Sequence, residues 1–414
     1  MSSTLRFGPE LRRLRQEAGL TLTEFSVALN YDKGHLSKVE RGERSASPEL
    51  ARRCDAFLGA NGELQRLVVR PATGADTTQT PATPSLRLVR RREVLAAGTS
   101  ALIDLGLQLG SQPSSAADPL LASFRVQFDQ LRKLGQSTAP KALLPLLETQ
   151  TRTVAALAAD TPSATRAPAL LLASRFAEFT GWMAQEAGDS GAALGWTGEA
   201  AELARAGGDP YLASYALVRR ALVTFYGGDA AGTVALARQA QSDGLPPRIR
   251  GLAAQREAQG HALVGDERDC LSSLDRAREL LDSDDARNGA EPVIGTTHVS
   301  DPAAMTTGWC LHDLGRPKAA AEILDRECRR LPPHALRTRA RYGVRRALAH
   351  AASGEVDHAC AIAGELLEVM AAVPSATVNS DVRYLARELS RFRSSQAVRD
   401  LQPALARVLA PAHG

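Results

Sequence analysis

The chain has 414 residues, of which 44% are hydrophobic and 4% aromatic, and its formal net charge is +4. This length allows more than one hydrophobic core, and the sequence contains no run of about 20 uncharged apolar residues, which argues against a membrane span. Five widely spaced cysteines without a CxxC pair argue against structural zinc and favour a reducing compartment, so we expect a cytoplasmic protein.

Residues 21–42 predict two short helices around a tight turn. Thr21 and Glu24 have the spacing of a capping box, so a helix begins near Leu22. Asp32 can cap a second helix that ends near Glu40. Helices over 9–18 and 49–58 complete a domain of four or five short helices. The apolar positions expected to face the core of the helix pair are Phe25, Ala28, Leu29, Leu36 and Val39.

Positive charge is concentrated in this part of the chain. Residues 1–92 contain 16 Lys and Arg against 10 Asp and Glu, whereas residues 93–414 contain 34 against 36. An excess of positive charge at one end favours a nucleic-acid partner there.

The string LSKVERGER at residues 36–44 resembles the helix-turn-helix domain of xenobiotic-response-element-type, phage-repressor-like transcriptional regulators, over about residues 5–68. In that family an arginine of the first helix pairs with the glutamate that ends the recognition helix, and Arg15 and Glu40 hold those positions. The resemblance implies a homodimer on double-stranded operator DNA, with half-sites about 34 Å apart. The DNA-contacting positions that it implies are Thr21, Thr23, Lys33, Gly34, His35, Ser37, Lys38, Arg41 and Arg44.

Gly34 departs from this pattern because it offers no side chain at a usual base-reading position. Base readout would then rely on Lys33, Lys38 and His35. The alternative is a helical hairpin that binds only protein.

Residues 69–89 form a linker, rich in Pro, Thr, Ala and Gly without apolar periodicity, at which the two parts of the chain can hinge. Residues 90–118 predict a connecting helix followed by a loose segment.

Residues 119–414 contain glycines 37 to 50 residues apart, each between two helical stretches. A small residue stands seven positions before and five positions after each glycine, as the close crossing of two helices requires. The pattern resembles the tetratricopeptide repeat and implies a helical solenoid, so the whole chain is expected to be all-α. The alternative is an unrepeated helical bundle. The five glycines are Gly188, Gly228, Gly265, Gly315 and Gly354.

In such a solenoid the first helices of the hairpins line a concave groove. Exposed aromatic and polar side chains there suit a peptide, small-molecule or protein effector, although aromatics at helical spacing are equally typical of a core. The phase of the repeat places in the groove Arg175, Glu178, Trp182, Tyr215, Phe225, Tyr226, Gln255, Gln259, Trp309, His312 and Arg341.

No motif of a hydrolase, a nucleotide-binding enzyme or a metalloprotease is present, so we expect no enzyme, no cofactor and no metal. The layout resembles repeat-containing regulators of actinobacterial type, which implies a transcriptional regulator controlled by an effector. Two alternatives are a protein-interaction scaffold whose helix-turn-helix does not read DNA specifically, and a repressor without an effector.

Overall fold

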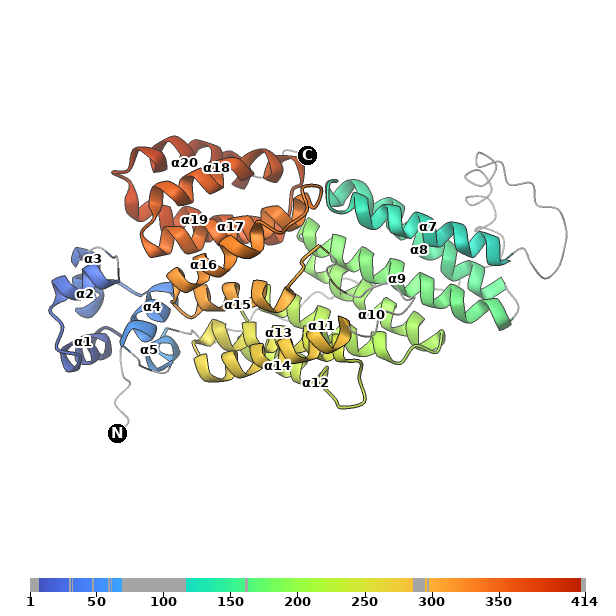
Figure 1. Ribbon diagram of the computed structural model, residues 1–414, viewed down its shortest axis with the longest axis horizontal. Coiled ribbons are helices and arrows are strands. Elements are labelled where there is room, and N and C mark those ends of the chain that lie inside the picture. Colours follow the sequence, from blue (N-terminus) through green and yellow to red (C-terminus); the bar gives the residue numbers. More distant parts are fainter. Residues whose placement is uncertain are drawn as a thin grey trace, which may run out of the picture.

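The computed structural model describes residues 7–29, 31, 33–46, 48–58, 60, 62–68, 117–160, 163–285, 295 and 298–410. All regular secondary structure in these residues is helical, as expected for an all-α chain. A small group of helices, α1 to α5, lies at one end of an elongated stack of longer helices (Figure 1). Within the described residues, no helix combines the length and apolar character needed to cross a membrane.

The N-terminal domain is a helix-turn-helix domain of five short helices. Thr21 donates its backbone N–H to Glu24, and Glu24 donates its own to the Thr21 hydroxyl, so the capping box is present. Phe25 and Leu36 are fully buried, but Ala28 is exposed, because it lies at the outer end of its helix. Asp32 lies outside the described residues. The helices are α1 (Phe7–Glu17), α2 (Leu22–Ala28), α3 (Lys33–Glu40), α4 (Pro48–Leu58) and α5 (Glu63–Arg66).

The rest of the described chain is a stack of helical hairpins. The helices are α7 (Ala117–Leu134), α8 (Pro140–Asp160), α9 (Ser163–Ala187), α10 (Ser190–Ala206), α11 (Tyr211–Tyr226), α12 (Ala230–Gln239), α13 (Pro247–Val264), α14 (Glu267–Asp285), α15 (Pro302–Asp313), α16 (Pro317–Cys328), α17 (Leu336–Ser353), α18 (Val356–Ala372), α19 (Ala376–Leu389) and α20 (Gln396–Leu409), with a 3₁₀ turn over Ser390–Phe392.

Each of the five expected glycines stands at a hairpin turn, and all have φ between 75° and 94°, a left-handed conformation that favours glycine. The paired small residues lie where the two helices of a hairpin cross. Ala221 and Thr233 are fully buried, for example, and a Cβ at Gly308 would lie 2.9 Å from Leu324. The repeat pattern is therefore confirmed as a series of close-packed helical hairpins, α9 to α18.

The linker expected over residues 69–89 lies outside the described residues, as does nearly all of the connecting segment expected over 90–118.

The helix-turn-helix domain packs directly against the repeats. The Arg53 guanidinium donates to the carbonyl of Leu29 in its own domain, to the carbonyl of Ala352 at the end of α17, and to Glu388 of α19. A Cβ at Gly265 would lie 1.4 Å from Gln65 Nε2, so a larger residue there would displace the Gln65 side chain. In Figure 1, α4 and α5 meet the ends of α13, α15 and α17. The two parts of the chain are therefore joined by a buried contact in addition to the covalent linker.

Candidate functional site

The helix-turn-helix presents a polar surface around α3. Lys33, Gly34 and Lys38 are exposed, and His35 and Ser37 are half-buried. The remaining residues expected to contact DNA are also exposed, namely Thr21, Thr23, Arg41 and Arg44. None of the nine belongs to the hydrophobic core, so all have some access to a partner.

Arg41 already has polar partners in the free protein. Its guanidinium donates to the Ser37 hydroxyl at 2.6 Å and to both oxygens of Glu43, at 2.6 and 3.0 Å. Both members of the Arg41–Glu43 pair are half-exposed, so the pair is weak and exchangeable. A phosphate could therefore replace Glu43 as the partner of Arg41.

Arg15 and Glu40 form the expected ion pair, which joins α1 to the end of α3. Arg15 Nε and Nη2 donate to the two Glu40 oxygens at 2.7 and 3.0 Å, and Nη1 donates to the Leu20 carbonyl at 2.6 Å. These hydrogen bonds to Glu40 raise the pKa of Arg15 against the effect of burial. The pair therefore fixes the orientation of α3 relative to α1 within the domain.

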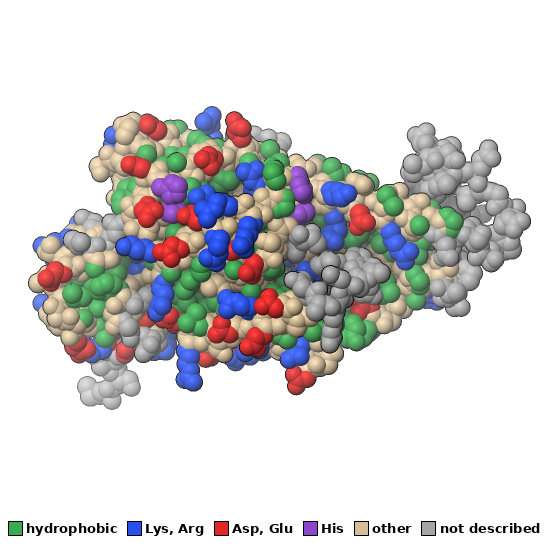
Figure 2. Space-filling view, in the orientation of Figure 1, with side chains coloured by type: hydrophobic (Ala, Val, Ile, Leu, Met, Phe, Trp, Pro, Cys, Tyr) green, Lys and Arg blue, Asp and Glu red, His purple; other side chains and the backbone are tan. Residues whose placement is uncertain are grey.

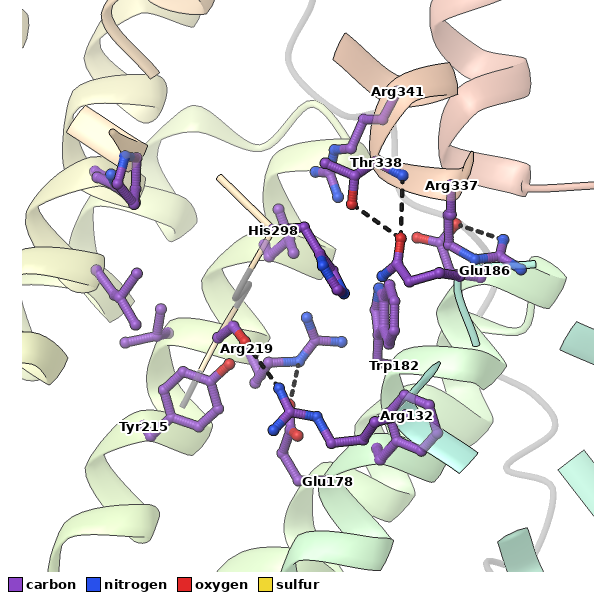
Figure 3. Close-up of a pocket in the computed structure, with 18 of the residues that line it drawn as sticks. Arg132, Glu178, Trp182, Glu186, Tyr215, Arg219, His298, Arg337, Thr338 and Arg341 are labelled. Carbon is purple, nitrogen blue, oxygen red and sulfur yellow. Dashed lines mark hydrogen bonds and ion pairs between the residues drawn. The ribbon is translucent and has the colours of Figure 1, made fainter. Parts of the chain in front are cut away.

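The repeats enclose a cavity of about 420 Å³ between α7 and the first helices of the hairpins. Figure 3 shows Trp182, Tyr215 and Arg341, on helices far apart in sequence, around this space together with His298, which precedes α15. The cavity is lined by six of the expected groove residues, namely Arg175, Glu178, Trp182, Tyr215, Gln255 and Arg341.

The other five expected groove residues lie elsewhere. Phe225, Tyr226 and His312 line a smaller cavity of about 120 Å³. Trp309 and Gln259 are only 1% and 2% exposed and line neither cavity. Trp309 packs between the rings of Phe225 on α11 and Tyr342 on α17, with both ring centres 6.1 Å from its own, so this position is buried within the stack.

Sequence reasoning missed several basic residues of the large cavity, among them Arg132 and Lys133 of α7 and Arg337 of α17. Other basic residues of the cavity could have been predicted from the phase of the repeat. Arg219 and Arg256 stand nine residues before their turn glycines, and both line the cavity. The residue thirteen positions before each of the five glycines also lines it, which identifies the cavity as the inner groove of the stack.

Some charges in the cavity are paired. Arg219 lies 3.5 Å from Glu178, and Arg337 lies 3.3 Å from Glu186 (Figure 3). Arg337 also donates to the Gly135 carbonyl at 2.8 Å, which ties α17 to the end of α7.

Arg256 and Arg341 differ from these, since neither is paired with a carboxylate in the part of the chain that the structure describes. Burial lowers the pKa of Arg256, and the nearby charge of Arg341 lowers it further. Two guanidinium groups therefore repel one another within the cavity.

A buried ionic network separates this cavity from the DNA-binding domain. Arg345 pairs with Asp313 at 3.0 Å and with Asp381 at 2.7 Å, and its guanidinium lies 3.8 Å from the centre of the Trp309 ring. Burial raises the pKa of Asp381, whereas Arg345 and His312 hold that of Asp313 below its usual range despite burial. Asp313 and Asp381 line the smaller cavity together with Arg52 of α4.

The histidines, scattered in sequence, partly gather in space (Figure 2). His350 and His358 have ring centres 4.4 Å apart, and Asp325 completes a group whose potential ligand atoms lie within 4.8 Å of one another. Both ring nitrogens of His350 already contact carboxylates, Glu355 at 2.7 Å and Asp325 at 3.0 Å. His350 therefore has partners within the protein at both ring nitrogens.

Comparison with known proteins gives a clear result for the N-terminal domain only. Residues 6–68 match the family model described as a helix-turn-helix domain. No curated protein matches the chain. Among solved structures, that of a Rap protein complexed with competence and sporulation factor aligns with 13% identity and a TM-score of 0.42, over 70% of this chain and 91% of that one. A similarity of this size does not establish a shared function.

Proposed function

We propose that this protein is a cytoplasmic transcriptional regulator that binds operator DNA specifically, as a homodimer, and whose DNA affinity is set by a ligand in the cavity of its repeats. One observation carries the proposal. Helices α15 and α17 line the cavity with their N-terminal halves and meet the DNA-binding domain at their C-terminal ends. Ligand site and DNA-binding domain thus share the same rigid elements.

The DNA-binding half of the proposal rests on the helix-turn-helix match and on the exposed basic residues of α3. A recognition helix places its exposed side chains against base edges in the major groove. Lys33 and Lys38 are the long donors on α3 that can reach base edges, and Arg44 lies beyond its end where it can reach phosphate.

The regulatory half rests on α17. Arg337 and Arg341, near its start, line the cavity, and the Ala352 carbonyl, near its end, accepts from Arg53 of the DNA-binding domain. Cationic donors suit this place, since the last carbonyls of a helix have no partner within the helix and carry partial negative charge. A ligand that moves α17 therefore moves the surface on which the DNA-binding domain rests.

The specific reading of DNA can be tested by selecting a preferred sequence from a random duplex library with the full chain, then measuring affinity by fluorescence anisotropy. Lys33→Ala with Lys38→Ala is expected to weaken binding to the selected sequence about 10-fold or more while changing binding to scrambled DNA much less. The wild-type affinity should fall with salt, with a log–log slope of about −0.9 per phosphate contact.

The matched control is Lys141→Ala with Lys318→Ala, which removes two exposed lysines of the repeat domain. It is expected to bind the selected sequence as the wild type does. If the wild-type chain shows no sequence preference, the scaffold function is favoured instead, and the side-chain-free Gly34 on the recognition face would be its structural basis.

A further inference from the structure

Unsatisfied buried polar atoms of the large cavity are hydrogen-bond donors. Arg341 Nε and Gln255 Nε2 are buried and have no partner among the described residues. The Arg256 guanidinium likewise has no hydrogen bond or ion pair within the described chain. Buried donors without acceptors are unfavourable, so a ligand that stabilises this site must bring acceptors.

The net charge of the cavity lining also favours a ligand with hydrogen-bond acceptors. Seven arginine and lysine side chains line the cavity, against three carboxylates. Glu178 and Glu186 engage Arg219 and Arg337, and Arg175 lies 3.9 Å from Asp209, which is outside the lining. Two like charges that face one cavity are stabilised by an anion between them.

Arg341 is held in place before any ligand arrives. Its guanidinium lies 5.4 Å from the ring centres of both Tyr226 and Trp309, within the range of cation–π contacts. A donor that is already fixed loses little conformational freedom when it binds.

The remaining wall of the cavity is apolar and aromatic. It includes Phe179, Trp182, Leu222, Leu252 and Tyr342. The volume of about 420 Å³ falls in the usual range of small-molecule sites and is too small for a folded partner.

We infer that the cavity binds a small amphipathic organic anion, whose carboxylate or phosphate group is held by Arg256, Arg341 and Gln255 and whose apolar body packs on the aromatic wall. This inference rests on the proposed function in one respect, since it identifies the class of the effector as a small organic anion. Binding of the anion to the cavity does not require that the protein bind DNA.

The test measures thermal unfolding of the full chain with two matched probe series. One has a naphthalene body (2-naphthoate, 2-naphthyl phosphate, 2-naphthamide and 2-naphthylmethylamine), and the other has a decyl chain with the same four head groups. At millimolar concentration we expect the carboxylate or phosphate of at least one series to raise Tm by about 2 °C or more. The amide and the amine of that series should not, and inorganic phosphate alone should give less.

Arg256→Met and Arg341→Met are each expected to abolish the Tm shift. Arg220→Met, which removes an exposed arginine beside Arg219, should keep it. The inference is overturned if no anion shifts Tm more than its amide, or if the shift survives both cavity substitutions.

Operator affinity measured with and without the binding probe separates the two proposals. Binding without any change in DNA affinity would refute ligand control and leave the anion site intact. Specific DNA binding without any anion binding would refute the anion site alone.

Discussion

The helix-turn-helix domain and the repeat cavity differ in whether their polar groups have hydrogen-bonding partners within the protein. In the domain, Arg15 and Glu40 satisfy each other, and Asp55 accepts the backbone N–H groups of Gly62, Leu64 and Gln65 at the start of α5. In the cavity, Arg341 Nε and Gln255 Nε2 are buried without an acceptor among the described residues, and the charge of Arg341 lowers the pKa of Arg256. The polar groups of the domain thus stabilise its fold, whereas several donors of the cavity have no partner among the described residues.

The largest effect is expected from Arg15→Met. It leaves Glu40 buried with no cationic partner, which destabilises a protein by about 3 kcal/mol. Hydrogen exchange of the full chain should then be faster in α1 and α3 and unchanged in the repeats. Equal protection of α1 and α3 in the variant and the wild type would show that the pair contributes nothing to stability.

A smaller effect is expected at Glu257, which neighbours Arg256 on α13 but faces the other side. Burial opposes its ionisation, yet hydrogen bonds from His261, Arg238 and Gln241 lower the pKa of Glu257 to about 2. Because the folded pKa lies below the unfolded value of about 4.3, its stabilisation is present above that value and is lost as pH falls towards 2.

Glu257→Gln is therefore expected to cost about 1–2 kcal/mol at pH 7, a figure reduced because the paired Arg238 is more than half exposed. The difference from the wild type should shrink in melts between pH 4.5 and pH 2. A difference that stays constant over this range would show that ionisation of Glu257 is irrelevant to folding.

The smallest effect, of opposite sign, is expected from Arg256→Met. The substitution removes a half-buried charge that has no hydrogen bond or ion pair among the described residues, so the free energy of unfolding should stay constant or rise by up to about 1 kcal/mol. Thermal unfolding without ligand measures this. A loss above 1 kcal/mol would mean that Arg256 is paired within the protein, and the contrast between the two regions would fail.

The features that could be predicted from sequence are those set by local spacing. The capping box at Thr21 and the left-handed turn at Gly188 follow from a few neighbouring residues. The contact of Arg53 with Glu388 could not be predicted in this way, because 335 residues separate the partners and a flexible linker composition suggests independent parts.

The groove was partly predictable for the same reason. Repeat phase identifies which face of a helix turns inwards, as it did for Tyr215 and Arg341. It does not give the packing between helices of different hairpins, which buries Trp309 between Phe225 and Tyr342. Positions equivalent in sequence therefore differ in exposure along the solenoid.

Helix α17 can be regarded as a lever arm. Its 18 residues span about 27 Å, with the cavity near one end and the Arg53 contact near the other. A tilt of about 5° at the cavity end would displace the far end by about 2 Å, which is large compared with the tolerance of a hydrogen bond to a base edge. On a two-fold operator the displacements of two such arms would add, so a small molecule could change the spacing of two recognition helices without unfolding either domain.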